Sequence, residues 1–347
     1  MKKMKIAGRA IGSGEPAFIV AEMSANHDRD LNQALALIDI AAAAGADAVK
    51  LQTYTADSLS IRTSHPSARV DPVWGSNTLY ELYSRAAMPM EFHAPLFERA
   101  RERGILIFSS AFDEDGVDYL EGLDVQAYKV ASPELVHIPL LRRIGETRKP
   151  VIVSTGMAGI GEVEEAVEAL AAAGSSQIAL LHCCSVYPAD PAAVNLNAMK
   201  TLRQVFQCPV GFSDHTLGIA VPIAAAALGA SIIEKHFTND ATRPGPDHRF
   251  SLTPEQLSEM IDGIRQAEIA RGSGRKVMAP EEAKNSAVAR RSLFATVDVP
   301  AGTKIEREML KVVRPGSGIH PRWLDTAVGR LARRDIKAGS PLTWDDL

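Results

Sequence analysis

The chain has 347 residues, of which 46% are hydrophobic and 23% are charged, and its formal net charge is −4. This length suits one large domain plus a small one, and the composition is too apolar for a disordered chain. The charge balance leaves no excess of basic side chains, which argues against a general nucleic-acid binder. It does not exclude a local cationic pocket for an anionic substrate.

The cysteines and the N-terminus indicate a cytoplasmic protein. The three cysteines, Cys183, Cys184 and Cys208, are odd in number and have no framework spacing, as expected of reduced thiols. No C-x-x-C pair is present, which argues against a thiolate zinc site. No signal-type apolar stretch follows the basic start, and the apolar segment 220–233 is too short to span a membrane.

Strand-like and helix-like segments alternate along about the first 270 residues. Continuous apolar runs, as expected of parallel strands buried on both faces, occur at Phe18–Ala25, Ala48–Thr53, Leu106–Phe112, Ala127–Ser132, Val151–Gly156, Ile178–Cys184, Val210–His215 and Ser231–Thr238. Amphipathic stretches predict helices at Leu31–Ala44, Glu91–Glu102, Ile138–Ile144, Gly161–Ala173, Leu196–Phe206, Ile219–Leu228 and Pro254–Arg271. This alternation predicts an α/β fold, a (β/α)8 TIM barrel. A doubly wound open sheet is the alternative, but its Gly-rich phosphate fingerprint does not follow the first strand.

The barrel pattern contains one long connection and ends before the C-terminus. The segment Asp57–Met90 is longer than an ordinary βα connection and predicts either a wall of the substrate pocket or a surface insertion. A polar linker at 276–290 is expected between a barrel domain at 1–275 and a small β-rich domain at 291–347. Short strands of the small domain are predicted at Ser292–Val297, Leu310–Val313 and Arg334–Ile336. A domain of this size is expected to pack on a larger one, in the same chain or a partner.

Two histidines stand at the ends of the last two predicted barrel strands. His215 ends one apolar run and His236, 21 residues later, ends the next. Neighbouring strands that end in imidazoles can place both rings on one divalent metal. Glu22, at a third strand end, could join them or act as a base. A structural role is the commoner interpretation of one such histidine, but the constellation favours a metal-assisted enzyme.

Polar residues gather at the predicted C-terminal ends of all eight strands, where barrel enzymes build their sites. They include Glu22, Asn26, His27, Lys50, Gln52, Ser109, Ser110, Lys129, Ser132, Glu134, Ser154, Thr155, Ser185, Tyr187, Ser213, Asp214, His215, Glu234, Lys235, His236 and Thr238. Lys50 and Lys129 lie inside apolar runs, where a lysine needs a partner, and predict a cradle for a phosphate and a carboxylate. Structural ion pairs are the alternative, and a Schiff-base lysine at Lys129 or Lys235 is a competing prediction. Lys235 should point away from the side of its strand that carries His236, which favours a structural role.

Several motifs together resemble the sialic acid (nonulosonic acid) synthase family. They are Ala21-Glu22-Met23-Ser24-Ala25-Asn26-His27, Lys50-Leu51-Gln52-Thr53, Lys129-Val130-Ala131-Ser132-Pro133-Glu134, Ser154-Thr155-Gly156-Met157, Gly211-Phe212-Ser213-Asp214-His215-Thr216, Glu234-Lys235-His236-Phe237-Thr238 and Gly245-Pro246-Asp247. The C-terminal part, with Val313-Arg314-Pro315-Gly316, resembles that family's antifreeze-like (SAF) domain. Within the family, the segments 21–27, 78–83 and 333–344 are most similar to pseudaminic acid synthases.

The resemblance implies condensation of phosphoenolpyruvate with an N-acetylated amino sugar aldehyde, here 2,4-diacetamido-2,4,6-trideoxy-L-altrose, to a nine-carbon nonulosonic acid and phosphate. It implies that His215 and His236 bind Mn²⁺, with Mg²⁺ and Co²⁺ as alternatives, and that Glu22 is the catalytic acid or base. It places phosphoenolpyruvate on Lys50, Ser110, Lys129, Ser132, Ser154 and Ser213, and the sugar on Gln52, Phe112, Glu134, Tyr187, Asp247 and Arg314. Arg314 would come from the partner subunit of a domain-swapped homodimer.

Three alternative functions stay open at the level of sequence. The first is an N-acetylneuraminate or legionaminate synthase, which would use N-acetylmannosamine or the diacetamido-trideoxy-manno sugar. Ser110 and Ser185 replace the Thr and Asn of the neuraminate-type pattern, which bears on sugar specificity. The second is a Schiff-base pyruvate aldolase. The third is a non-catalytic ice-binding protein, which the charged tail at 330–337 disfavours.

Overall fold

The computed structural model describes residues 3–71 and 75–347 of the chain, which divides into two compact units, Met1–Gly272 and Ser273–Leu347. Each unit has a hydrophobic core of its own. Of the long segment Asp57–Met90, residues 72–74 lie outside the described part. No helix of the described residues is both long enough and apolar enough to cross a membrane.

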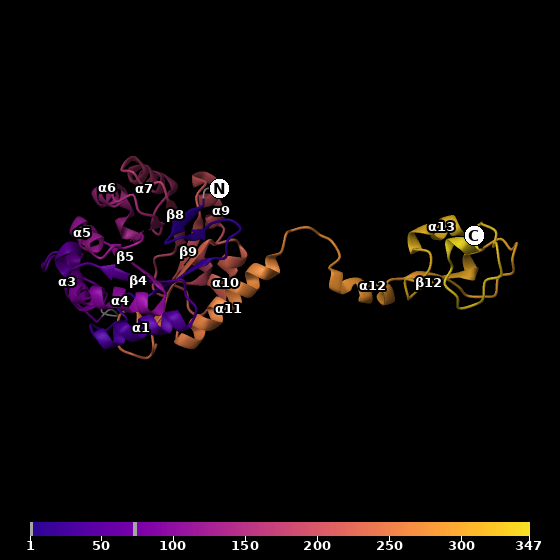
Figure 1. Cartoon of the computed structure of the whole chain (residues 1–347), viewed down its shortest axis with the longest axis horizontal. Coiled ribbons are helices and arrows are strands. Elements are labelled where there is room, and N and C mark those ends of the chain that lie inside the picture. Colours follow the sequence, from indigo (N-terminus) through magenta and orange to yellow (C-terminus); the bar gives the residue numbers. More distant parts are fainter. Residues whose placement is uncertain (1–2, 72–74) are drawn as a thin grey trace. The chain divides into compact units, whose positions relative to one another are not determined.

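Within the described residues, eight parallel strands of the first unit close into a barrel, which confirms the predicted (β/α)8 fold. In chain order they are β3 (Phe18–Glu22), β4 (Ala48–Thr53), β5 (Leu106–Ala111), β6 (Tyr128–Val130), β7 (Val151–Ser154), β8 (Ile178–Cys183), β9 (Val210–Asp214) and β10 (Ile232–His236). The strands are apolar on both faces because helices cover the outside of the ring (Figure 1). The register sets Glu22 beside His236 on one side and beside Lys50 on the other.

The helices of the first unit are α1 (Leu31–Ala43), α2 (Ala56–Leu59), α3 (Leu79–Ala86), α4 (His93–Arg103), α5 (Glu114–Gly122), α6 (Ile138–Glu146), α7 (Ile160–Ala172), α8 (Pro191–Val194), α9 (Ala198–Phe206), α10 (Ala220–Ala227) and α11 (Pro254–Arg271). Local signals fix their ends. Asp30 accepts the first free N–H groups of α1, and α11 begins at the Thr253/Gln256 capping box. The sequence did not predict α5, since it buries only Gly116, Val117 and Leu120 behind an acidic first turn.

An antiparallel hairpin, β1 (Met4–Ile6) and β2 (Arg9–Ile11), precedes the barrel. It was not predicted, because each strand has only three residues. The Lys5 amide donates to Gln177, the residue before β8, at 2.8 Å, and Ile6 and Ile11 join the barrel core. The hairpin therefore packs at the N-terminal ends of the strands, away from the predicted site.

The second unit contains α12 (Ala283–Ala289), α13 (Leu324–Ala327) and an antiparallel pair, β11 (Ser292–Ala295) and β12 (Leu310–Val313). The predicted strand at Arg334–Ile336 was wrong. Ile336 makes only an isolated bridge to Val299, because a turn follows at once at residues 338–339. Short 3-10 helices in the two units are η1 (Pro66–Ala68), η3 (Met90–Phe92), η4 (Pro133–Val136), η5 (His248–Phe250), η6 (Pro280–Glu282), η7 (Arg307–Met309), η8 (Pro321–Trp323) and η9 (Trp344–Asp346).

Candidate active site

A cavity of about 270 Å³ opens at the C-terminal ends of the barrel strands. Of the predicted site residues, those that line it are Lys50, Gln52, Ser110, Lys129, Ser132, Ser154, Tyr187, Ser213, His215, His236 and Asp247. Glu22 is fully buried behind Lys50 and Gln52, with which it interacts directly. The other predicted site residues lie elsewhere: Phe112 and Glu134 are not among the residues that line the cavity, and Arg314 belongs to the second unit.

Strand alternation decides which side chains face the barrel interior. On β10, Glu234 and His236 line the cavity. Lys235 between them faces the other way, where its Nζ donates to Asp214 Oδ2 at 2.6 Å. Ser213 on β9, the neighbour of Asp214, again lines the cavity. The buried Lys235–Asp214 pair therefore agrees with the structural role expected for Lys235.

A buried ion network occupies the interior of the site. Lys50 Nζ lies 3.0 Å from Glu22 Oε2 and 2.7 Å from Glu234 Oε1. Lys129 Nζ lies 3.4 Å from the same Glu234 oxygen, to which the Ser213 hydroxyl donates at 3.1 Å. Glu234 is therefore the shared anion of both lysines. It was predicted only as a strand-end polar residue, although its spacing of two from His236 would have placed it on the interior face.

Burial and neighbouring charges shift the pKa values of the Glu22 and Glu234 carboxyl groups in opposite directions. Burial raises the pKa of Glu22 to about 7; the negative charge of Glu234 adds to this, and the positive charge of Lys50 opposes it. Burial also opposes ionisation of Glu234, but the positive charges of Lys129 and Lys50 outweigh it and hold that pKa at about 2. Two buried carboxyls with separated pKa values are typical of an acid/base site. Glu22 is the group able to exchange a proton near neutral pH.

The two lysines also differ. Burial disfavours the charged form of both. For Lys50 the charges of Glu22 and Glu234 reverse the effect and raise its pKa, whereas for Lys129 burial prevails and lowers the pKa. Lys50 therefore stays positively charged. The fold stabilises the charged form of Lys129 less well, so an anionic ligand beside Lys129 would be favourable.

Unpaired hydroxyl groups face the same space. In the part of the chain that the structure describes, Ser110 Oγ and Ser154 Oγ are buried without a hydrogen-bond partner. Ser132 Oγ accepts from the Gly156 amide at 3.0 Å. A buried hydroxyl without a partner is costly, so these donors fit a ligand rich in acceptor oxygens. A phosphate or a carboxylate beside Lys129 has this chemistry.

A hydrogen-bond chain connects the ion network to the rim. Gln52 Nε2 donates to Glu22 Oε1 at 2.9 Å and to Ser24 Oγ at 3.0 Å, and the Ser24 hydroxyl donates to Asp247. Burial raises the pKa of Asp247. The arrangement places Gln52 and Asp247, both predicted to contact the sugar, on one side of the cavity.

The two predicted metal ligands lie together. The ring centroids of His215 and His236 are 5.3 Å apart, and burial lowers the pKa of both rings, to about 4 for His215. Nδ1 of His215 lies 3.0 Å from the Cys184 carbonyl, so it carries the proton and leaves Nε2 with a free lone pair. His236 Nδ1 is buried without a partner among the described residues.

Neutral imidazoles with free nitrogens fit a divalent metal of the borderline class. The described residues nevertheless contain no group of three or more His, Cys, Asp or Glu side chains arranged for a metal. Two histidines would be the protein's share of the coordination, and substrate or water would supply the remaining ligands.

An aromatic and apolar wall completes the cavity. Tyr54, Leu82 and Tyr83 line it, and α3 supplies the last two, so this helix of the long segment does form a wall of the pocket. Phe112 packs behind Tyr54, with ring centroids 5.1 Å apart. Tyr187 also lines the cavity, with its ring centroid 4.2 Å from that of His215. Sequence reasoning missed Tyr54, Leu82 and Tyr83, since no periodicity signalled where the long segment would return.

Glu134 lies in η4, directly after the lining residues Ser132 and Pro133. Burial raises its pKa to about 7, and Oε2 has no hydrogen-bond partner in the described residues. Cys183, on β8, also lines the cavity, and its Sγ lies 3.8 Å from His215 Nδ1. Because side chains alternate between the two faces of a strand, the position of Cys183 in β8 was the sequence signal that could have placed it in the cavity.

Residues 37–276 match the NeuB family and residues 290–347 match the SAF domain. The N,N'-diacetyllegionaminic acid synthase of Legionella pneumophila is 40% identical, over 97% of this chain and 96% of that protein. The pseudaminic acid synthase of Campylobacter jejuni is also 40% identical, over 95% of this chain and 96% of that protein. An N-acetylneuraminic acid synthetase from Leptospira borgpetersenii, solved with citrate, is 33% identical with a TM-score of 0.73, over 82% of this chain and 95% of that chain. These matches confirm the family resemblance drawn from the motifs.

Proposed function

The chain belongs to the NeuB family, a family of nonulosonic acid synthases, and on that premise we propose that it condenses phosphoenolpyruvate with an N-acetylated amino sugar aldehyde. The products are a nine-carbon nonulosonic acid and phosphate. The observation that carries this proposal is the pairing of two buried lysines on one carboxylate, Glu234, beside unpartnered serine hydroxyls. Such a site attracts a small ligand with two anionic groups, and phosphoenolpyruvate has a phosphate and a carboxylate.

The reaction joins C3 of phosphoenolpyruvate to the aldehyde carbon of the open-chain sugar. An oxocarbenium ion develops at C2, water adds there, and the tetrahedral intermediate loses phosphate by cleavage of the C–O bond. Lys50 and Lys129 stabilise the anionic groups throughout, and Ser110 and Ser154 donate hydrogen bonds to them. Glu22, with its pKa of about 7, accepts the proton of the attacking water or returns one to the new hydroxyl.

His215 and His236 would hold a divalent metal, for which we propose Mn²⁺. When bound, the metal would act as a Lewis acid on the sugar's aldehyde oxygen. The protein's own contribution is orientation. The bond from His215 to the Cys184 carbonyl fixes one tautomer, and the Tyr187 ring packs against this imidazole.

For the sugar we propose 2,4-diacetamido-2,4,6-trideoxy-L-altrose, which makes the protein a pseudaminic acid synthase. The legionaminic acid synthase of Legionella pneumophila and the pseudaminic acid synthase of Campylobacter jejuni are each 40% identical to this chain, so the choice rests on the motifs at 21–27, 78–83 and 333–344. The wall of Tyr54 and Leu82 supports a 6-deoxy sugar, because a methyl group buries against it without the unpaired hydroxyl that N-acetylmannosamine would bring.

We also propose a cytoplasmic homodimer in which the SAF domain of each subunit covers the partner's active site. This proposal supplies a place for Arg314, which is exposed within its own unit. In that arrangement its guanidinium would bind the sugar's N-acetyl group.

The function is tested by offering three sugars separately with phosphoenolpyruvate and Mn²⁺ and identifying products by mass spectrometry. They are the diacetamido-trideoxy-altrose, its manno isomer and N-acetylmannosamine. Product from the altro sugar alone is the expected result. Product from one of the others alone would keep the reaction and overturn the sugar assignment.

A further inference from the structure

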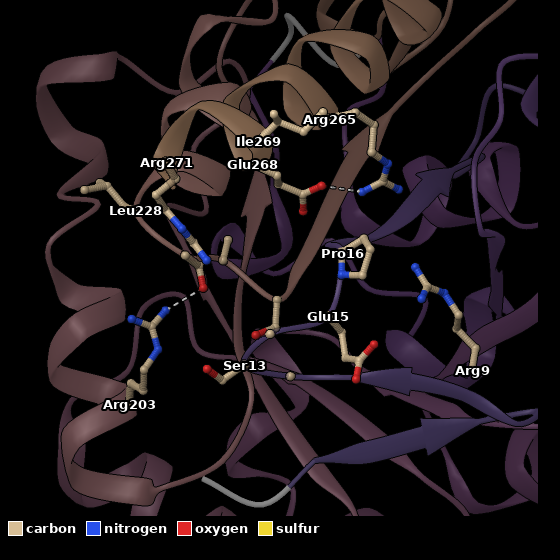
Figure 2. Close-up of a pocket in the computed structure, with 15 residues that line it drawn as sticks. Arg9, Ser13, Glu15, Pro16, Arg203, Leu228, Arg265, Glu268, Ile269 and Arg271 are labelled. Atoms are coloured by element: carbon tan, nitrogen blue, oxygen red, sulfur yellow. Dashed lines mark hydrogen bonds and ion pairs between the residues drawn. The ribbon is translucent and has the colours of Figure 1, made fainter. Parts of the chain in front are cut away.

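A second cavity, of about 690 Å³, lies at the opposite, N-terminal end of the barrel strands (Figure 2). The loop between β2 and β3, the residues before β10 and the C-terminal parts of α9 and α11 form it. Its charged lining residues are Arg9, Glu15, Arg203, Arg265, Glu268 and Arg271. The proposed synthase reaction uses none of them.

Two of the four arginines are neutralised within the fold. Arg9 and Arg265 lie 3.4 Å and 3.5 Å from the carboxylate of Asp47. Arg265 also pairs with Glu268 at 3.1 Å and donates to the Ala17 carbonyl at 2.9 Å. Arg265 thereby links α11 to the residue before β3, and Arg9 links β2 to the residue before β4. Both guanidinium groups already have a carboxylate partner within the fold.

The other two, Arg203 and Arg271, converge on one point without a carboxylate. A Cβ placed on Gly229 would lie 3.1 Å from Arg271 Nη1 and 3.7 Å from Arg203 Nη2. Neither side chain has an ion-pair partner within the described residues. Burial and the positive charge of Arg271 lower the pKa of Arg203. Figure 2 shows the two guanidinium groups across the cavity from Arg9 and Arg265.

Helix ends explain part of this placement. Each arginine lies in the last turn of its helix, where a cation is favourable, and Arg203 Nη2 donates to the Gly229 carbonyl at 2.8 Å. A favourable helix end does not require two cations to meet over one glycine. Gly229 has φ of +88°, and any larger residue there would be strained and would crowd the space between the guanidinium groups.

Neutral donors and an apolar surface lie beside the arginine pair. The hydroxyls of Ser13 and of the buried Ser231 belong to the same lining and make no hydrogen bond within the described part of the chain. Leu228 is 52% exposed and Ile269 is 81% exposed on the same rim. The cavity volume is also far larger than a lone phosphate occupies. This surface suits a ligand with an anionic head and a larger organic body.

We propose that Arg203 and Arg271 bind the phosphate group of a phosphate ester at this end of the barrel. Guanidinium groups bind phosphate oxygens by paired, charge-assisted hydrogen bonds, which would relieve the repulsion between the two arginines. Ser13 and Ser231 supply further donors to the same group, and Leu228 and Ile269 pack against the body of the ester. The site is distinct from the cavity that holds Lys50 and Lys129.

Isothermal titration calorimetry with AMP, inorganic phosphate and adenosine tests this proposal. The titrations use full-length protein with Lys129→Met, which weakens anion binding at the synthase site by removing one of its two lysines. AMP should bind at one site per chain and adenosine should not. Adding Arg203→Gln or Arg271→Gln should weaken AMP binding at least tenfold. Arg142→Gln, which replaces an exposed arginine elsewhere on the barrel, should leave it unchanged.

The exposed Arg271 can be replaced without disturbing the core, so its variant decides the matter if Arg203→Gln does not fold. AMP binding that is tighter than phosphate binding supports a phosphate ester, whereas equal affinities would reassign the site to free phosphate. Unchanged AMP binding in Arg271→Gln, or equal binding of adenosine, would overturn the proposal. Phosphate release by Arg271→Gln with Lys129 intact should match that of the parent protein. This assay therefore distinguishes a failure of the proposed synthase reaction from a failure of the phosphate-ester proposal.

Discussion

Replacing Glu22 with glutamine should stop the reaction and make the protein more stable at neutral pH. The folded-state pKa of about 7 lies above the ordinary value of 4.5, so the fold favours the protonated carboxyl. The contribution of Glu22 to stability is therefore fully present below pH 4.5 and is lost as the pH rises through 7. Glutamine keeps the size of the protonated form and has no charge to bury, and its amide oxygen can still accept from Gln52 or from Lys50.

The magnitude follows from the pKa interval. Between 4.5 and about 7, at 1.36 kcal/mol for each pH unit, ionisation of Glu22 in the unfolded chain favours unfolding by about 3 kcal/mol. The free energy of unfolding of Glu22→Gln should equal that of the parent protein below pH 4.5. It should exceed the parent value by about 3 kcal/mol at pH 7 to 8.

Urea denaturation at several pH values from 4 to 8 measures this difference, and phosphate release measures the reaction. Glu15→Gln is the matched control, because Glu15 pairs with Lys3 at the surface and its pKa is lowered instead. The control should show no rise in stability with pH relative to the parent protein. A Glu22→Gln protein that loses stability together with activity would refute the reasoning, since Glu22 would then be a structural ion-pair partner of Lys50.

Three further results are expected. Ser110→Ala should raise KM for phosphoenolpyruvate about tenfold with little loss of stability. Ser109→Ala removes a 2.6 Å hydrogen bond to Thr53, so it should lower the free energy of unfolding by about 1 kcal/mol and leave KM unchanged. The reverse pattern would contradict the proposed site. Glu234→Gln should lower the free energy of unfolding by about 3 kcal/mol in urea titrations, because two buried lysines lose their shared anion, and unchanged stability would contradict that role. Borohydride with pyruvate should leave Lys129 unmodified by mass spectrometry; a covalent adduct would favour the aldolase alternative.

The barrel and most of its site were predictable because both depend on local patterns. Parallel strands buried on both faces give continuous apolar runs, and residues at their C-terminal ends meet at one end of the barrel. That rule predicts that Lys50, Lys129, Ser213 and the two histidines lie together, and all five line the cavity. Strand parity likewise separated Lys235 from its neighbours.

The remaining features depend on contacts that no local pattern encodes. The return of α3 over the cavity, with Leu82 and Tyr83, follows from tertiary packing of a long segment. The role of Glu234 as the anion of two lysines from other strands depends on distances across the barrel. Arg203 and Arg271 are 68 positions apart, and only the fold brings both to Gly229.

The most direct test of the proposed reaction uses phosphoenolpyruvate labelled with ¹⁸O in the oxygen that bridges C2 and phosphorus. Mass spectrometry would follow the label after turnover with the diacetamido-trideoxy-altrose and Mn²⁺. Label recovered in inorganic phosphate, with an unlabelled nine-carbon acid, is the expected result, because water adds at C2 and the C–O bond breaks. Label retained in the sugar acid, or no phosphate release with any of the three sugars from folded, metal-loaded protein, would contradict the account.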